Sequence, residues 1–567
     1  MLKRLLALLL AVLMLLSLAA CGGKNETAQT QNGIADDGEE YHGEMPIVKP
    51  GDEPITLKIG LVTNANVTDY KDNDYTKWLE EQTGLNLEFM QFSGSSKDIA
   101  TQVALMIAGG EKLPDILKPG SGISKIQADE YGLDGYFIDL KPYFEKYAYH
   151  HTQAFERIFP NNPEVRETMM LRAEEPSTGK IFCFAKMEHA NTDRPVVQTW
   201  INTKWLEKLG LSAPTTVGEL REVLQAFRDK DPNGNGKADE IPLSCKADSS
   251  YADCFRQIIN AYVYWNPHYD FNVDENGKLW IPYNTDEYRQ ALCYISDLVK
   301  DGLISTLNWT QSAEERKNMF NPATSDEEVA GILGGHGTLS FSPGSPALYD
   351  YDPLPPFKAE TPLGGYAPLR SYSYSFNTFI TADCEHPVEA FKLLDFMSTE
   401  ESFLRGRYGV PGRDWEFVDA PPADERGGRA FKRLIENPFS TQNNINWHGN
   451  WSVNDYTYYN ITPDNEWSEL LSKKTAKNFE YCVEAGQPEK TFIFGIYTRD
   501  EDEVRTEIEK DLQDFIKDRR AQFCTGVLDP YDDTQWQEYL DGLEKMRCSE
   551  WIAMAQTAYD RLPEQFK

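Results

Sequence analysis

The chain has 567 residues, a formal net charge of −34, 40% hydrophobic residues and 12% aromatic residues. This length predicts two or three folded units rather than one, and the apolar content is sufficient for large cores. The surplus of negative charge disfavours nucleic acid as a partner, because phosphate binding requires a basic surface.

The N-terminal 20 residues have the pattern of an export signal. Lys3 and Arg4 precede an almost wholly apolar stretch that is short for a bilayer span. The small residues before Cys21 resemble a bacterial lipobox, so we expect residues 1–20 to be removed and Cys21 to carry fatty acyl chains such as palmitate. An ordinary signal peptide that contains a cysteine is the alternative. The expected location is the outer face of a cell membrane, with the chain anchored by lipid.

Residues 21–53 are polar and acidic and are expected to form a disordered tether. Strands and helices then alternate. The strands are expected at 55–61, 85–89 and 113–117, and the helices at 75–82 and 100–108. This alternation predicts a parallel α/β sheet, in which ligands bind beyond the carboxyl ends of the strands.

Residues 200–242 predict a strand and two helices, followed by a loop with the oxygen spacing of a calcium site. Thr216 is the expected N-cap of the second helix, with Glu219 as its capping-box partner. In the loop DPNGNGKADE, acidic and amide side chains recur at alternate positions, and Gly236 stands where the chain must turn sharply. The glutamate that ends an EF-hand loop is replaced by Pro242, so a carboxylate just before it would take that role. The predicted calcium ligands are Asp231, Asn233, Asn235, Lys237 through its carbonyl, Asp239 and Glu240. A polar turn without metal is the alternative.

Aromatic-rich and glycine-rich segments supply the candidate ligand contacts, because flat rings pair well with the C–H faces of sugars. The candidates are Trp265 and His268 in YVYWNPHY, His336 in a glycine loop, Tyr366 and Arg370 before a strand, and Trp447 in an Asn-rich loop. Each has a structural alternative: core packing for the aromatic residues, a tight turn for the His336 loop, and an ion pair for Arg370.

Eight cysteines follow Cys21, with no CxxC pair among them. Several lie in apolar runs, where cysteine behaves as a small buried hydrophobic residue. We expect mostly free, buried thiols. Cys245–Cys254 is the most plausible bridge if one exists, and a metal cluster is not expected.

Several motifs occur in a fixed order: LMIAGG before LPDIL, WINTKWLEKLGL with PTTVGEL, DPNGNGKADEIP, and HPVEAFKLLDFM with RYGVPGRDWE. This ordered set resembles the family 1 extracellular solute-binding lipoproteins of ATP-driven (ABC) transporters. It is most similar to the large branch that includes alginate- and oligosaccharide-binding proteins. The resemblance extends over nearly all of the chain after the tether.

The resemblance implies an α/β fold of two lobes joined by a hinge, with a ligand cleft between them. The expected division is 54–195 plus 371–412 for lobe one, and 196–370 plus 413–567 for lobe two with the C-terminal helices. The implied calcium ion is structural. The implied function is capture of a solute, with an oligosaccharide as the expected class, and its delivery to an ABC transporter permease, without enzymatic activity. The implied protein is a monomer attached to the membrane through its N-terminal lipid. An exported glycoside-acting enzyme, or a lipoprotein binding peptides or other small solutes, is the alternative.

Overall fold

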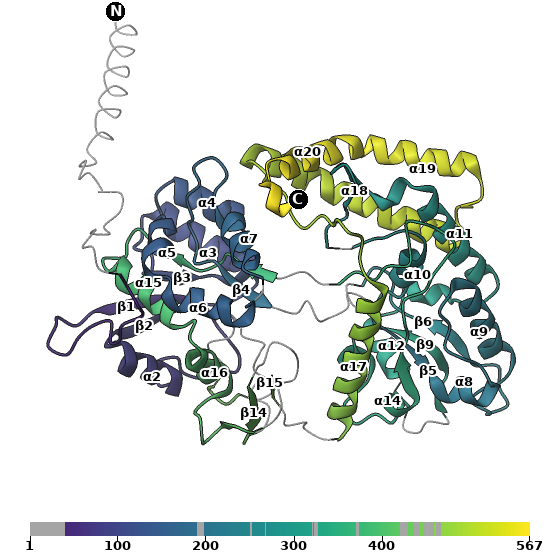
Figure 1. Cartoon of the computed structure of the whole chain (residues 1–567), viewed down its shortest axis with the longest axis horizontal. Coiled ribbons are helices and arrows are strands. Elements are labelled where there is room, and N and C mark those ends of the chain that lie inside the picture. Colours follow the sequence, from purple (N-terminus) through teal and green to yellow (C-terminus); the bar gives the residue numbers. More distant parts are fainter. Residues whose placement is uncertain are drawn as a thin grey trace, which may run out of the picture.

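The structure is a computed structural model with two α/β lobes (Figure 1). It describes residues 40–160, 162–189, 198–249, 252–266, 268–319, 321–322, 327–369, 373–419, 429–435, 442–445, 451, 459–460 and 466–567. None of the helices in these ranges has the length and apolar composition that a membrane crossing requires.

Lobe one is built on a four-stranded sheet in the order β12-β3-β1-β2. The strands are β1 (Thr56–Val62), β2 (Asn86–Phe92), β3 (Ile116–Lys118) and β12 (Phe379–Ile380). β1 pairs in parallel with β2 and β3, as the sequence predicts, because α2 (Asp74–Thr83) and α3 (Ser96–Gly109) form the crossovers. β12 returns from far along the chain and is antiparallel to β3.

The strand predicted at 113–117 begins later than expected. The backbone N–H of Leu113 donates to a carboxylate oxygen of Asp383 at 2.7 Å, and Pro114 has no N–H to give to a neighbouring strand. Sheet pairing therefore starts only after these residues. The remaining helices of this lobe are α4 (Lys125–Leu133), α5 (Lys141–Tyr147), α6 (Tyr149–Ile158), α7 (Glu164–Ala173) and α15 (Pro387–Phe396).

Lobe two has a second four-stranded sheet in the order β10-β5-β9-β6. Its strands are β5 (Thr199–Asn202), β6 (Ile241–Ser244), β9 (Ala330–Gly334) and β10 (Tyr351–Pro353). β9 is parallel to β6 and antiparallel to β5. The helices packed around it are α8 (Thr203–Leu209), α9 (Val217–Asp229), α10 (Phe255–Tyr262), α11 (Asp286–Lys300), α12 (Ala313–Met319), α13 (Gly337–Ser340), α14 (Ala347–Asp350) and α17 (Glu466–Ala485).

The C-terminal helices α18 (Arg499–Thr525), α19 (Asp533–Lys545) and α20 (Cys548–Asp560) cover lobe two, and Figure 1 shows them in yellow along its upper side. Trp536 and Trp551 bury their rings in the same core as α10 and α11. The predicted capping box of α9 is present, since Thr216 and Glu219 exchange hydrogen bonds.

Two further sheets lie outside the main ones. β4 (Lys186–His189) pairs with β11 (Ser373–Ser375), which precedes the return of the chain into lobe one. β13 (Trp415–Phe417), β14 (Ala430–Arg433) and β15 (Tyr459–Asn460) form a small sheet next to α16 (Glu400–Tyr408). Trp451 packs in the core of lobe one, whereas the predicted division assigned every residue after 412 to lobe two.

The buried carboxyl group of Glu328 should make the free energy of unfolding depend on pH. Its side chain is buried, with 2% of the residue exposed, and one carboxylate oxygen accepts from Asn202 Nδ2 at 2.7 Å. Burial, and then the nearby carboxylate of Asp350, raise the pKa of Glu328 to about 8. A folded-state pKa above the unfolded value means that the folded state is favoured while Glu328 is protonated. This stabilisation is full below about pH 4.5 and is lost as the pH rises to about 8, by at most ~1.4 kcal/mol per pH unit.

Glu328→Gln removes this titration while preserving the size of the side chain. We expect the melting temperature of the wild type to fall relative to that of Glu328→Gln between about pH 5 and pH 8. The comparison of the two proteins cancels the contributions of groups that titrate alike in both. Glu385→Gln, on an exposed side chain, is the matched control. Melting temperatures of the wild type and Glu328→Gln that change equally with pH across this range would contradict the prediction.

Candidate functional site

The carboxyl ends of β1, β2 and β3 meet at one edge of the lobe one sheet. Lys118 ends β3 and is 7% exposed; its Nζ donates to Asn377 Oδ1 at 3.0 Å. The ring of Trp451 lies over it, with Nζ 5.5 Å from the ring centroid. Trp451 closes the Asn-rich segment in which Trp447 was predicted to contact a ligand, so the fold brings one end of that segment to the edge where ligands of parallel sheets bind.

Residues 442–445 of the same segment are fastened to the connection between β1 and α2 through Asn444. Its side-chain oxygen accepts from the N–H groups of Thr68 and Asp69, both at 3.1 Å, and its Nδ2 donates to Asp72 O at 2.8 Å. Its own N–H donates to the carbonyl of Asn66 at 3.0 Å. The backbone of Asn444 is left-handed, with φ of 57°, a conformation that asparagine tolerates better than most residues.

Asn444→Ala should therefore destabilise lobe one by about 1–3 kcal/mol, because three side-chain hydrogen bonds are lost in a strained backbone position. Urea unfolding measures this loss, and hydrogen exchange at residues 64–73 should speed up in the variant. Asn444→Gly is the matched control, since it relieves the strain but lacks the hydrogen bonds. If Asn444→Ala is as stable as the wild type in urea, the hydrogen bonds contribute nothing.

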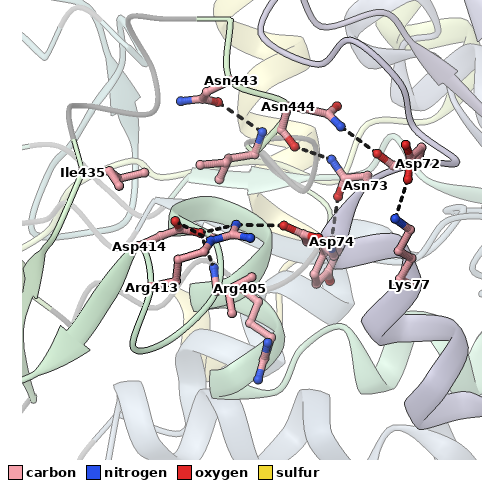
Figure 2. A pocket seen from close by; sticks show the side chains of 14 residues that line it. Asp72, Asn73, Asp74, Lys77, Arg405, Arg413, Asp414, Ile435, Asn443 and Asn444 are labelled. Atoms are coloured by element: carbon pink, nitrogen blue, oxygen red, sulfur yellow. Dashed lines mark hydrogen bonds and ion pairs between the residues drawn. The ribbon is translucent and has the colours of Figure 1, made fainter.

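A pocket of 540 Å³ opens beside Asn444, between the start of α2 and the end of α16 (Figure 2). Figure 2 shows ion pairs among its charged side chains: Arg413 reaches Asp74 at 2.8 Å and Asp414 at 2.7 Å, and Lys77 is paired with Asp72. Arg405 is paired with Glu401, at 2.7 Å, outside the lining residues. Because these charges are neutralised by their partners, the pocket presents a polar surface without a strong preference for an ion of either sign.

A second pocket, of 460 Å³, is lined by both lobes, and we call it the interlobe pocket. Lobe one contributes α4, α7 and the residues after α7, while lobe two contributes the segments 268–271 and 492–499 with α18 and α20. Arg499 Nη2 and Glu130 Oε1, 2.9 Å apart, join the two sides across it. The aromatic residues that line the pocket are Tyr269, Phe271, Phe376, Phe492, Phe494, Tyr497 and Trp551.

Arg172 organises one wall of the interlobe pocket. Its guanidinium carbon lies 5.2 Å from the ring centroid of Phe494 and 5.3 Å from that of Tyr374, so it connects rings of the two lobes. Burial lowers the pKa of Arg172, although the group remains a cation at neutral pH. Rings, a cation and nearby carboxylates together suit a polar ligand that has apolar faces.

The structure separates the predicted ligand residues. His268 lines the interlobe pocket. Trp265 is only 4% exposed and is packed in the lobe two core, with the guanidinium carbon of Arg520 4.8 Å from its ring centroid. A sugar cannot stack on a ring that is covered in this way, so the core alternative describes Trp265 in this structure.

His336 and Tyr366 lie elsewhere in lobe two. His336 precedes α13 just beyond the end of β9, and its carbonyl accepts from Ser340 N at 2.9 Å. Tyr366 lines a small cavity of 20 Å³ and packs edge-on against Tyr264. Cys21, Arg370 and Trp447 lie outside the described residues.

Sequence reasoning did not single out Tyr269, Phe376, Phe494 or Arg172. Tyr269 ends the aromatic-rich segment that contains His268, so a signal for it was present. Phe494 belongs to the apolar run FIFGIY, and nothing in that run distinguishes a pocket wall from a strand.

The loop 231–240 turns around the side chain of Asp231. Asp231 accepts from the N–H groups of Gly234, Asn235 and Gly236 at 2.9–3.1 Å, so its carboxylate lies at the centre of the turn. Asn235 Nδ2 reaches both oxygens of Asp239 at 3.1 Å. Burial, and then the charges of Asp231 and Asp239, raise the pKa of Glu240 above its usual value.

Glu240 is the residue that best tests whether a cation fits. Its Oε1 is buried without a hydrogen-bond partner, which is costly for a carboxylate and is relieved by a cation. Over the described part of the chain, no three acidic, histidine or cysteine side chains converge as a ready metal cage. Amide and backbone oxygens would therefore have to complete the set, as hard cations accept.

Comparisons with known proteins point to one family. Residues 185–402 match the family of bacterial extracellular solute-binding proteins. The fructooligosaccharide ABC transporter substrate-binding protein FusA of Streptococcus pneumoniae is 24% identical over 557 residues, covering 96% of this chain and 95% of its own. Lipoprotein LipO of Bacillus subtilis is 24% identical over 473 residues, covering 80% and 82%.

Solved structures share the fold. An HMO-binding solute-binding protein from Bifidobacterium longum infantis superposes with a TM-score of 0.71 at 20% identity, over 90% of this chain and 99% of its own. FusA in complex with kestose gives a TM-score of 0.64 at 22% identity, over 89% and 99%. Residues 185–402 thus match the bacterial extracellular solute-binding proteins, and the two α/β lobes of this chain share the fold of these solved structures.

Proposed function

We propose that this protein captures an oligosaccharide between its two lobes and delivers it to the permease of an ABC transporter. The observation that carries the proposal is the interlobe pocket, whose walls come from both lobes. A ligand that touches both walls binds the closed arrangement more tightly than an open one, and this difference drives closure. The closed, loaded form is then the one that a permease can distinguish from the empty form.

The chemistry of the pocket favours a carbohydrate. Aromatic rings from both lobes offer faces for the C–H surfaces of sugar rings, and Arg172, Glu130 and Glu174 offer donors and acceptors for hydroxyl groups. The relatives also support a carbohydrate ligand, since FusA is a fructooligosaccharide-binding protein and its structure was solved with kestose. A Bacillus subtilis relative, YtcQ, that binds polygalacturonan or rhamnogalacturonan is 29% identical over 121 residues.

Isothermal titration of the protein with kestose, nystose, galacturonide oligomers and short peptides tests this proposal. Binding of one saccharide class, with the sugar recovered intact after prolonged incubation, is the expected result. Saccharide breakdown would favour the glycoside-acting enzyme, and binding of peptides alone would overturn the choice of ligand class.

We further propose that the chain is anchored by lipid on Cys21 and that loop 231–240 holds a structural calcium ion. Small residues before Cys21 and the similarity to a lipoprotein of Bacillus subtilis support the anchor. Asp231, Asn233, Asn235, Asp239, Glu240 and the carbonyl of Lys237 would hold the ion, which supplies charge compensation and no chemistry. Cys21→Ser should release the protein from cells that retain the wild type, and incorporation of labelled palmitate should be lost with it. Retention of the variant on cells would contradict the lipid anchor.

A further inference from the structure

Cys245 and Cys254 lie at the two ends of one short loop in lobe two. Cys245 follows β6 directly, and Cys254 directly precedes α10. Two hydrogen bonds hold the ends of the loop together. Lys246 N donates to Ala252 O at 3.0 Å, and Asp248 N donates to a carboxylate oxygen of Asp253 at 3.0 Å. Both cysteines are buried thiols in this structure.

The position of Gly334, at the end of β9, sets an upper limit on the distance between the Cβ atoms of the two cysteines. A Cβ built on Gly334 would lie 2.8 Å from the Cβ of Cys245 and 3.0 Å from the Cβ of Cys254. The separation of the two cysteine Cβ atoms therefore cannot exceed the sum of these distances. Bonded cysteines have Cβ atoms about 3.5–4.5 Å apart, a separation that this upper limit allows. Any residue larger than glycine at 334 would occupy the space that the pair fills.

We propose that Cys245 and Cys254 are joined by a disulfide in the exported protein. The two thiols lose two protons and two electrons, and the S–S bond forms between their sulfur atoms. The acceptor is the disulfide of an extracellular thiol–disulfide oxidoreductase, which is reduced to a dithiol. One cysteine attacks that disulfide to form a mixed disulfide, and the other then displaces the oxidoreductase. An extracellular solute-binding protein meets such oxidising conditions.

In the folded lobe, the charge of Arg316 and the burial of the pair act on the Cys254 thiol in opposite directions. Arg316, 2% exposed in the folded chain, donates from Nη1 to the carbonyl of Gly334 at 2.5 Å, and its positive charge favours the thiolate form of Cys254. Burial opposes ionisation of Cys254 once folding is complete. The bond would therefore form while the loop is still accessible to the oxidoreductase.

The disulfide would secure the loop that carries Asp248, which is paired with Arg520 of α18. A cross-link restricts the unfolded chain more than the folded one, so it raises the melting temperature. Its consequence is stability of the carboxyl edge of the lobe two sheet rather than ligand contact. The inference is thus independent of which solute is bound.

Mass spectrometry of the full chain tests the proposal. The exported protein is purified without reductant and unfolded in guanidinium chloride with N-ethylmaleimide, so that buried free thiols react, and is then digested. We expect a peptide pair joined through Cys245 and Cys254, with maleimide on Cys183, Cys293, Cys384, Cys482, Cys524 and Cys548. Maleimide on Cys245 and Cys254, or either of them joined to another cysteine, would overturn the proposal.

Thermal melting supplies a second readout. The double variant Cys245→Ser, Cys254→Ser should melt several degrees below the wild type when both are kept oxidised, and the difference should shrink after both are refolded with reductant. Cys548→Ser, another buried cysteine, should show no such dependence on reductant. An equal difference in both conditions would mean that the cysteines act only by packing, and would also overturn the proposal.

Discussion

Tyr269→Ala is expected to weaken oligosaccharide binding by about 10- to 100-fold, or ~1.4–2.8 kcal/mol. The ring of Tyr269 is partly exposed, lines the interlobe pocket from lobe two and rests edge-on against Phe492, with centroids 6.3 Å apart. Removing it leaves a void where a sugar face would lie. Isothermal titration with the saccharide that binds the wild type most tightly measures the loss.

Phe376 provides the corresponding test from the other wall, because it follows β11 and packs against the lobe one core. If the ligand bridges the lobes, Phe376→Ala should weaken binding to a similar extent. Tyr269→Phe retains the ring and should bind within a few-fold of the wild type. Tyr349→Ala removes a tyrosine that is 51% exposed and does not line the interlobe pocket, and it should bind normally. Unchanged affinity in both Tyr269→Ala and Phe376→Ala would exclude this pocket as the ligand site.

Removal of calcium is expected to lower the melting temperature by about 5–10 °C, because a ligand at 100 times its Kd stabilises the folded state by about 2.7 kcal/mol. The Glu240 carboxylate has an unpartnered buried oxygen and a raised pKa, so it destabilises the loop unless a cation is present. Glu240→Gln should therefore melt below the wild type in calcium, yet at or above it in chelator. Differential scanning calorimetry in both conditions measures this reversal of order.

Lys237→Ala is the matched control for the calcium prediction. Only the backbone carbonyl at this position would reach the ion, so the variant should respond to calcium and chelator as the wild type does. A wild-type melting temperature that is the same in calcium and in chelator would leave the loop as a polar turn held together by the Asp231 hydrogen bonds.

The local sequence was enough to predict elements whose stability is decided within a few residues. The capping box of Thr216 and Glu219 and the turn centred on Asp231 both follow from short-range spacing of polar and apolar residues. The strand predicted at 113–117 was misplaced, because the partner of Leu113 is Asp383, 270 residues away. No window of sequence contains that contact.

The candidate binding site shows the same division between what short stretches of sequence predict and what distant contacts decide. The sequence alone determined the family motifs, the calcium-type loop and the aromatic segment that contains His268 and Tyr269, because each is a continuous pattern. Only the tertiary structure decided that Trp265 is covered by Arg520, and that Phe376 and Phe494 line one pocket with Tyr269. The physical reason is that an aromatic side chain is equally apolar in a core and in a binding site. What distinguishes the two is whether distant segments cover its faces or leave them open, and the packing of the lobes settles that.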